Sequence, residues 1–305
     1  MTTTGTTSFN LDLANLMEEA FERAGGEIRS GYDVRTARRS LNLLTIEWAN
    51  RGINLWTIEE GQIPLNQGQI AYNYPSDTID LLDQVVRTQT GIDQVDINIT
   101  RISVSTYATI PNKNAQGRPI QVWINRQSGT VAATDLTLTT GGIDAAQTTI
   151  ELSGTPTTLP QVGFINLDSE TIQYSGISGN TLTGCIRGQN NTTAASHVAT
   201  TKVYLNNLPC VNVWPTPNQD NYYTFVYWRL KRIDDAGNGR AEQDVPFRLM
   251  PCLVAGLAYY IAMKIPEGQA RVDRLKLDYE EQWLLASSED REKAALRLAP
   301  REMFF

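Results

Sequence analysis

Histidine and cysteine are scarce in this chain of 305 residues, which has one histidine and three cysteines. The histidine is His197, and the cysteines, Cys185, Cys210 and Cys252, lie far apart. Zinc sites need clustered His and Cys ligands, and disulfide frameworks need cysteines in even numbers. The composition therefore argues against both and favours a reducing compartment.

Long hydrophobic runs are also missing. The longest apolar segment, residues 253–265, is shorter than the ~20 residues that span a bilayer, and Pro266 follows it. Residues 1–7 (MTTTGTT) have neither the basic region nor the apolar core of a signal peptide. We expect a flexible polar arm at this end and no membrane insertion.

Basic residues are in the minority, with 26 Lys and Arg against 33 Asp and Glu, a net charge of −7. Coating nucleic acid requires a basic surface that neutralises phosphates, so this balance argues against a nucleic-acid coat. An acidic channel, in contrast, repels DNA and lets it pass without sticking. The length predicts about two domains.

Helical periodicity marks the N-terminal part of the chain. Asp12 is the expected N-cap of a first helix, which Gly25-Gly26 ends, and Asp33 is the expected N-cap of a second, which Gly52 ends. Two amphipathic helices with a short link predict an antiparallel pair. The polar face of the second helix carries Arg35, Arg38, Arg39 and Glu47.

The C-terminal part repeats the pattern. A broad apolar face from Met250 to Ile261 predicts a central helix that starts at Pro246 and ends at Pro266. A charged helix follows, with an apolar side that includes Tyr279 and Trp283.

Between these helices the pattern is that of strands. We expect strands at residues 53–58, 62–65, 69–74, 95–99, 120–124, 211–214 and 222–233. Residues 79–86 fit either a strand or a short helix, and Asn66-Gln67-Gly68 predicts a hairpin turn. The aromatic strand at 222–233 is expected to be buried against the helices rather than to stack bases or sugars.

The composition changes sharply at residues 131–209, which are rich in Thr, Gly and Ser and contain only Arg187 and Lys202 as basic residues. Short strands are expected at 143–152, 163–167, 170–174, 180–186 and 202–205, with a hairpin at Ser178-Gly179-Asn180. The strands flanking this segment, 119–127 and 211–214, are expected to pair with each other, because insertions succeed where chain ends lie close together.

The predicted fold class is therefore α+β. We expect a discontinuous helical-bundle domain with a small sheet, formed by residues 1–130 and 210–305, and an inserted all-β domain, residues 131–209.

Catalytic signatures are weak. A Ser-His-Asp triad on His197 lacks a nucleophile-elbow motif, so a histidine in a turn or at a strand edge is the preferred interpretation. The carboxylate pairs Glu59-Glu60, Asp234-Asp235 and Glu280-Glu281 lack any sign of an apolar pocket. Phosphate-binding and dinucleotide-binding glycine motifs are absent from the sequence. We expect no enzyme activity and no cofactor.

A series of short motifs, in a fixed order over residues 8–130 and 210–300, resembles the head-to-tail adaptor family of short-tailed bacteriophages, also called tail accessory factors. The motifs are Leu41-Asn42-Leu43-Leu44, Trp48-Ala49-Asn50-Arg51-Gly52, Ile102-Ser103, Tyr107, Asn112-Lys113, Gly117-Arg118-Pro119, Trp214-Pro215-Thr216-Pro217, Tyr227-Trp228-Arg229, Ile233-Asp234-Asp235, Asp244-Val245-Pro246-Phe247-Arg248, Ala255-Gly256-Leu257-Ala258-Tyr259-Tyr260, Tyr279 and Ala286-Ser287-Ser288-Glu289-Asp290-Arg291.

The inserted segment resembles a second element, a small β-module of phage tail and baseplate proteins. The resemblance lies in residues 164–176 (FINLDSETIQYSG), 182–188 (LTGCIRG) and 192–197 (TTAASH). A plain adaptor lacks such an insertion, so the outer face of the assembly is not expected to be bare.

The adaptor resemblance implies a ring of twelve copies beneath the portal at the head–tail junction of the virion, made in the bacterial cytoplasm. Such a ring extends the DNA channel, retains the packaged genome without specific DNA binding, and offers a platform to downstream tail or fibre proteins. Its C-terminal segment docks on the portal protein. The residues expected to dock are Arg291, Lys293, Arg297, Arg301, Met303, Phe304 and Phe305.

Two other functions stay open from the sequence. One is a peptidoglycan-degrading enzyme of the phage tail, since relatives of the family have been discussed as cell-wall hydrolases. The other is a glycan- or receptor-binding module carried by the insert. For Phe304-Phe305 the alternative to a docking anchor is a loose chain end.

Overall fold

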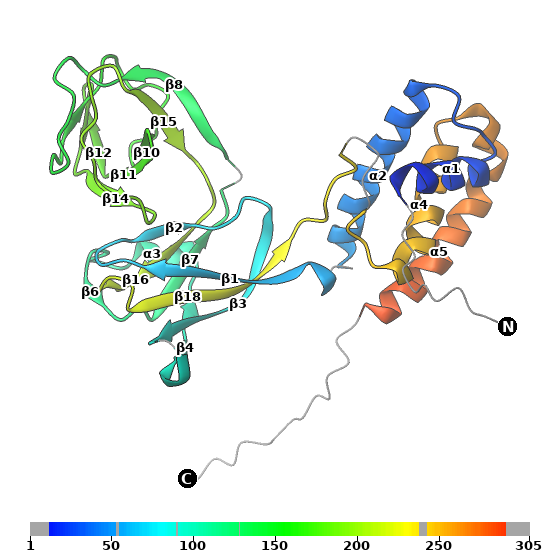
Figure 1. Cartoon of the computed structure of the whole chain (residues 1–305), viewed down its shortest axis with the longest axis horizontal. Coiled ribbons are helices and arrows are strands. Elements are labelled where there is room, and N and C mark those ends of the chain that lie inside the picture. The colour runs from blue at the N-terminus through cyan, green and yellow to red at the C-terminus, as the bar shows by residue number, and fades with distance from the viewer. Residues whose placement is uncertain (1–11, 53–54, 90, 128, 238–242, 291–305) are drawn as a thin grey trace, which may run out of the picture. The chain divides into compact units, whose positions relative to one another are not determined.

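The computed structural model describes residues 12–52, 55–89, 91–127, 129–237 and 243–290. The chain divides into two compact units, residues 1–58 with 231–305, and residues 59–230. The first unit is helical and the second is built mainly of strands (Figure 1), so the α+β class is confirmed. The boundaries expected near residues 130 and 210 lie within the second unit.

The described residues of the first unit form four α-helices, and α4 packs against the other three. None of the described helices combines the length and the apolar composition that crossing a bilayer requires. The helices are α1 (Leu13–Ala24), α2 (Gly31–Arg51), α4 (Met250–Ala262) and α5 (Val272–Glu289), with short 3₁₀ turns at Leu55–Thr57, Phe247–Leu249 and Pro266–Arg271.

The ends of the two N-terminal helices follow from capping chemistry. Asp12 accepts a hydrogen bond from the Asn15 N–H at 2.8 Å and is the N-cap of α1, as predicted. The prediction that Asp33 caps α2 was wrong, since the N-cap is Ser30. Asp33 is the third helical residue and accepts from the Ser30 N–H at 2.9 Å, which completes a capping box. Gly52 ends α2 in the left-handed region, as predicted.

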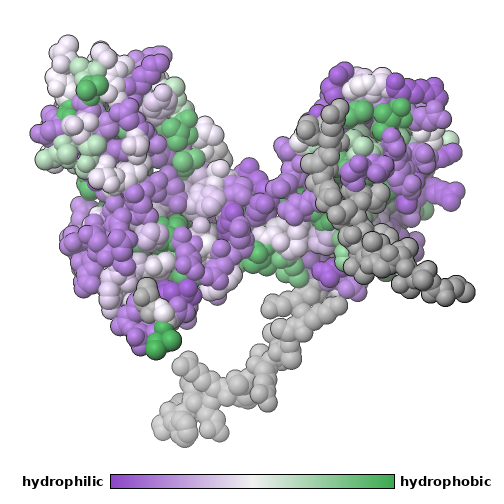
Figure 2. Space-filling model, viewed as in Figure 1, coloured by the Kyte–Doolittle hydropathy of each residue, from purple (hydrophilic) through white to green (hydrophobic). Residues whose placement is uncertain are grey.

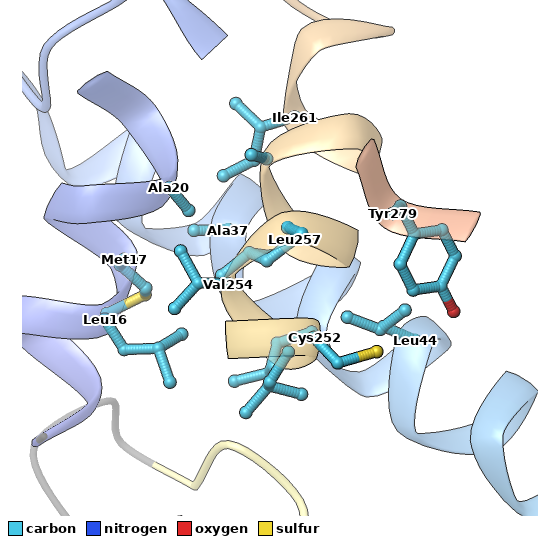
Figure 3. Close-up of a cluster of buried hydrophobic side chains, with 14 of the residues drawn as sticks. Leu16, Met17, Ala20, Ala37, Leu44, Cys252, Val254, Leu257, Ile261 and Tyr279 are labelled. Carbon is cyan, nitrogen blue, oxygen red and sulfur yellow. The ribbon is translucent and has the colours of Figure 1, made fainter. Parts of the chain in front are cut away.

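The core of the helical unit forms around α4, as its broad apolar face predicts. Val254, Leu257 and Ile261 are almost completely buried, and Figure 3 shows them facing side chains of α1, α2 and α5. A Cβ on Gly256 would lie 2.8 Å from the Tyr279 ring and 2.9 Å from Leu44. Glycine is therefore required at this position for α4 to approach its neighbours so closely.

A buried polar contact joins α2, in the N-terminal part of the sequence, to α5, in the C-terminal part. The Trp48 Nε1–H of α2 donates to the Tyr279 hydroxyl of α5 at 3.2 Å, and the guanidinium of Arg51 lies over the Trp283 ring. Burial raises the pKa of the Tyr279 hydroxyl, so that group stays neutral. These side chains hold α2 and α5 against the same helix although the whole β-rich unit separates them in sequence.

The part of the second unit outside the predicted insert has two four-stranded sheets and a two-stranded one. The first sheet has the order β1 (Ile58–Leu65), β18 (Tyr223–Lys231), β3 (Thr78–Thr88) and β4 (Val95–Asn98). The second has the order β2 (Ala71–Asn73), β16 (Cys210–Trp214), β7 (Gln121–Asn125) and β5 (Thr100–Arg101). β17 (Thr216–Pro217) pairs with β6 (Gln116–Gly117), and α3 spans Val104–Ala108.

Several expectations for these strands can be settled. Residues 79–86 belong to a strand. Phe225 and Tyr227 of the aromatic strand are buried, but in the apolar cluster of the β-rich unit, so the expectation that this strand packs against the helices was wrong. The hairpin predicted at Asn66-Gln67-Gly68 was wrong: β1 pairs with β18 and β2 with β16, so the turn joins strands of different sheets. The predicted pairing across the insert is confirmed, because β7 and β16 run antiparallel from Asn125↔Cys210 onward.

The insert itself contains a five-stranded and a three-stranded sheet around its own apolar cluster. The hairpin predicted at Ser178-Gly179-Asn180 is present. The larger sheet has the order β14 (Ile186–Gln189), β11 (Glu170–Tyr174), β10 (Gly163–Leu167), β15 (Lys202–Asn206) and β8 (Val131–Thr137). The smaller has the order β12 (Gly176–Ser178), β13 (Thr181–Thr183) and β9 (Ile150–Glu151).

A polar seam joins the insert to the neighbouring strands. Asn190 and Asn191, both at positive φ, turn their side chains outward from the insert. Asn190 accepts from the Asn73 N–H at 2.6 Å, and the Asn191 amide donates to the Pro64 carbonyl at 3.0 Å. Gln69, buried at 7% exposure, accepts from the Asn191 N–H at 3.1 Å. The insert is thus attached by hydrogen bonds as well as by its two chain connections.

Replacing residues 131–209 with a short Gly-Ser linker is expected to leave the helical unit folded. Asn125 and Cys210 are already paired neighbours, so a short link closes the gap, and loop-closure entropy changes slowly with length. The variant should keep the far-ultraviolet circular-dichroism signal of its helices, with a small stability loss from the broken seam. Disappearance of that helical signal would show that the insert is required for folding.

Candidate functional site

The histidine lies in a buried cluster of charged side chains in the insert. His197 Nδ1 is 2.8 Å from an Asp168 oxygen and its Nε2 is 2.8 Å from Glu170 Oε2. Arg187 donates from Nε and Nη2 to the two oxygens of Glu170, each at 2.8 Å. Glu170 is 1% exposed and His197 6%. Asp168, in contrast, is exposed, so Glu170, Arg187 and His197 lie in the interior of the module and the cluster reaches its surface at Asp168.

Strand positions bring these residues together. Glu170 begins β11, Asp168 lies in the tight β10–β11 turn at a φ of 50°, and Arg187 lies on the neighbouring β14. His197 forms an isolated bridge with Ile143. Arg187 also donates to the carbonyls of Asp144 and Ala195, so it ties two loops to the sheet.

Hydrogen bonding sets the charge state of the central carboxylate. Burial alone would raise the pKa of Glu170, but bonds from Arg187, from His197 and from the N–H groups of Ala195 and Gly188 outweigh it and lower that pKa. Glu170 is therefore an anion at neutral pH that accepts from four groups. It organises the module and has no acceptor site left for a substrate.

The geometry does not fit a nucleophilic triad. Both nitrogens of His197 already lie within hydrogen-bond distance of carboxylate oxygens, one of Asp168 and one of Glu170. In the part of the chain that the structure describes, no Ser, Thr or Cys side chain hydrogen-bonds to His197. This ring has no nitrogen free to act as a general base.

The remaining sequence candidates also fall into structural roles. Glu59 pairs with Arg229 at 2.5 Å, Asp234 with Lys231 at 3.3 Å and Glu280 with Arg51 at 3.4 Å. The three cysteines are buried and free. Among the described residues, no group of His, Cys, Asp and Glu is placed to hold a metal ion. The residues expected to dock on the portal, Arg291 to Phe305, lie outside the described residues.

Glu170, Arg187 and His197 lie in the three segments that resemble the β-module, but the contacts among them were not predicted from the sequence. The signal was available: Arg187 is one of only two basic residues, Arg187 and Lys202, in a Thr-rich segment. A long cationic side chain in such a segment needs a partner when it is buried. The register of β11 and β14 supplies that partner, and register cannot be read from the composition.

One further surface feature was not expected. Ile92, in the short turn η2 (Gly91–Asp93) between β3 and β4, is fully exposed, and Val95 beside it is 53% exposed. Figure 2 shows hydrophobic surface at this end of the hairpin among largely hydrophilic surroundings. Two exposed aliphatic residues do not form the large contiguous patch that marks an interaction site.

The sequence matches no protein-family model and no curated protein.

The acid dependence of the insert follows from the charge state of Glu170. Because its pKa is lower in the fold than in the unfolded chain, its stabilising contribution is full above the unfolded value of about 4.3 and is lost as pH falls through the folded value. We expect wild type to exceed Glu170→Gln in thermal stability at pH 7, with the difference shrinking below about pH 4. A difference independent of pH would contradict this assignment.

Proposed function

We propose that the protein is a structural head-to-tail adaptor of a short-tailed bacteriophage, which forms a ring beneath the portal. The proposal is supported by the order of the adaptor-like motifs along the chain. One observation carries it: two motif-bearing segments from opposite ends of the sequence, around Trp48 and around Gly256, meet in one helical core. In this proposal the ring extends the DNA channel, retains the genome and carries the insert as an attachment module.

The buried charge network favours a structural role for the insert over a hydrolytic one. Glu170 hydrogen-bonds to both Arg187 and His197, and among the described residues no Ser, Thr or Cys side chain hydrogen-bonds to His197. A turbidity assay on purified cell walls tests the competing enzymatic function, and lysis by the purified protein would overturn the proposal.

The decisive experiment for the adaptor function is an electron-microscopy reconstruction of the phage particle. Gold labelling or antibody decoration of residues 131–209 should place this protein in a ring directly below the portal. A location on the capsid surface, or at the tip of a fibre, would contradict the proposal.

The C-terminal segment supplies a further prediction. Its sequence combines Arg297 and Arg301 with an apolar end, Phe304-Phe305. Burial of two Phe side chains contributes on the order of 3–6 kcal/mol before the cost of ordering the chain. A truncation after Pro300 should therefore keep its thermal stability but lose portal binding in light-scattering assays, and its particles should leak DNA. Normal portal binding by the truncated protein would show that Phe304-Phe305 is a loose chain end and not a docking anchor.

A further inference from the structure

An open groove of about 780 Å³ lies between α1 and the first turns of α4. Met250 and Val254 line it and are buried, whereas Phe247 beside them is 64% exposed. The opposite rim is formed by α1, through the acidic residues Glu18 and Glu22 among others. The groove thus combines an apolar floor with an acidic edge.

The charge of this edge is not neutralised within the described part of the chain. Glu19 pairs with Arg23 at 2.8 Å, but Glu18 and Glu22, one helical turn apart, have no ion-pair partner there. Arg248 is the basic residue on the other side of the groove. Two adjacent carboxylates therefore face solvent beside exposed apolar surface.

A surface of opposite character lies on α2, on the side turned away from the buried Leu41 and Leu44. There Arg35 and Arg39, one turn apart, are followed by Leu43, at 52% exposure, and Ile46, at 57%. We call these four residues the α2 ridge.

The basic end of the α2 ridge also lacks carboxylate partners among the described residues. Among the described residues, Arg39 makes a long side-chain hydrogen bond to Thr36, at 3.4 Å, and no ion pair with a carboxylate.

We propose that the groove between α1 and α4 receives the α2 ridge of a second copy of this chain. This inference rests on the proposed ring function and names the contact that builds the ring. Leu43 and Ile46 would cover the apolar floor beside Phe247, while Arg35 and Arg39 would pair with Glu18 and Glu22. Each copy carries both halves on different helices, so copies can join head-to-tail, and such a chain of copies forms a ring when the rotation between neighbours closes.

Duplex DNA is the competing occupant of the ridge, because arginines bind phosphates. Two observations favour a protein partner. Leu43 and Ile46 continue the ridge with apolar surface, which a phosphate backbone does not match. The groove on the same chain supplies carboxylates at the same one-turn spacing as the arginines.

The test uses single-cysteine additions to the full chain, whose own three cysteines are buried. Glu22→Cys and Arg39→Cys proteins are mixed and treated with a short bismaleimide, at high concentration and again with portal present. The geometry predicts a mixed covalent dimer and little dimer of either variant alone. Lys276→Cys, on the exposed face of α5, is the matched control and should not react with either partner.

Charge reversal gives a second, independent readout. Glu18→Arg with Glu22→Arg should weaken self-association about tenfold or more, and Arg35→Glu with Arg39→Glu should do the same. Mixing the two variants should restore association, since the charges are complementary again. Association of wild type should also weaken as salt is raised.

The outcomes separate the interface from the function. If wild type forms rings that neither variant disturbs, the interface is elsewhere and this inference fails while the adaptor function stands. Cross-linking of Glu22→Cys with itself would indicate a two-fold contact and would also overturn it. If the arginine variant instead loses DNA binding and keeps association, the ridge is a DNA contact. No association of wild type, even with portal, would remove the proposed function as well.

Discussion

Replacing Arg187 with alanine is expected to unfold the inserted β-module under conditions in which the wild type is stable. The substitution removes both Arg187 bonds to Glu170 and leaves that carboxylate, at 1% exposure, with only His197 and the N–H groups of Ala195 and Gly188 as partners. Breaking a buried ion pair by removing one partner costs about 3–5 kcal/mol, a large share of the stability of a small domain. The loops around Asp144 and Ala195 lose their anchor at the same time.

Limited proteolysis of the full chain measures this effect. Cleavage should begin within residues 131–209, while the helical circular-dichroism signal persists. Arg126→Ala is the matched control, since Arg126 is 53% exposed in its pair with Asp80 and exposed pairs contribute only about 0–1 kcal/mol. Wild-type resistance to protease in Arg187→Ala would show that the network does not hold the module together.

Leu257→Ala is expected to produce the second large effect, in the helical unit. Leu257 is completely buried on α4, the helix that packs against α1, α2 and α5. Truncating a buried leucine costs about 2–5 kcal/mol, because the transfer free energy is lost and a cavity remains. Since α4 packs against α1, α2 and α5, these helices could fill that cavity only by shifting from their present contacts.

The same substitution on an exposed site provides the control. Leu277 lies on α5 and is 72% exposed, so Leu277→Ala should change stability by about 0.5 kcal/mol or less. Thermal denaturation followed by far-ultraviolet circular dichroism compares the two variants directly. Equal transition temperatures for both would contradict the central position of α4 in the core.

Local chemistry made the helices predictable. The periodic apolar positions of α1, α4 and α5 and the glycine stops at Gly25 and Gly52 identify the elements because helix formation depends on near neighbours. The error at Asp33 is instructive, since Ser30 and Asp33 form a reciprocal pair and either is a plausible cap from sequence alone.

Partners distant in sequence were harder to predict. β1 and β18 pair across most of the β-rich unit, and no local pattern specifies which strand completes a sheet. This is why Asn66-Gln67-Gly68 was read as a hairpin turn. The β7–β16 pairing was an exception, because an insertion requires its two flanking strands to lie close together.

The charge network of the insert and the two complementary surfaces of the helical unit were hard to predict for the same reason, because both depend on residues that are distant in sequence. Glu170, Arg187 and His197 become a unit only through strand register, and Glu18 and Arg39 become relevant only once burial shows which charges lack partners. Composition alone gives a net charge of −7 and hides the separation of acidic and basic faces on neighbouring helices.

The way in which the insert is attached also decides how it bears load. β7 and β16 leave their sheet side by side at Asn125 and Cys210, so a pull on the insert opens that ladder one rung at a time, as a zipper opens. Strands pulled from opposite ends would resist by all their rungs together. The hydrogen bonds of Asn190 and Asn191 to Asn73 and Pro64 form a second tether beside the zipper. Tension applied to the insert is thereby divided between two attachments, and the first rungs are relieved of part of the force.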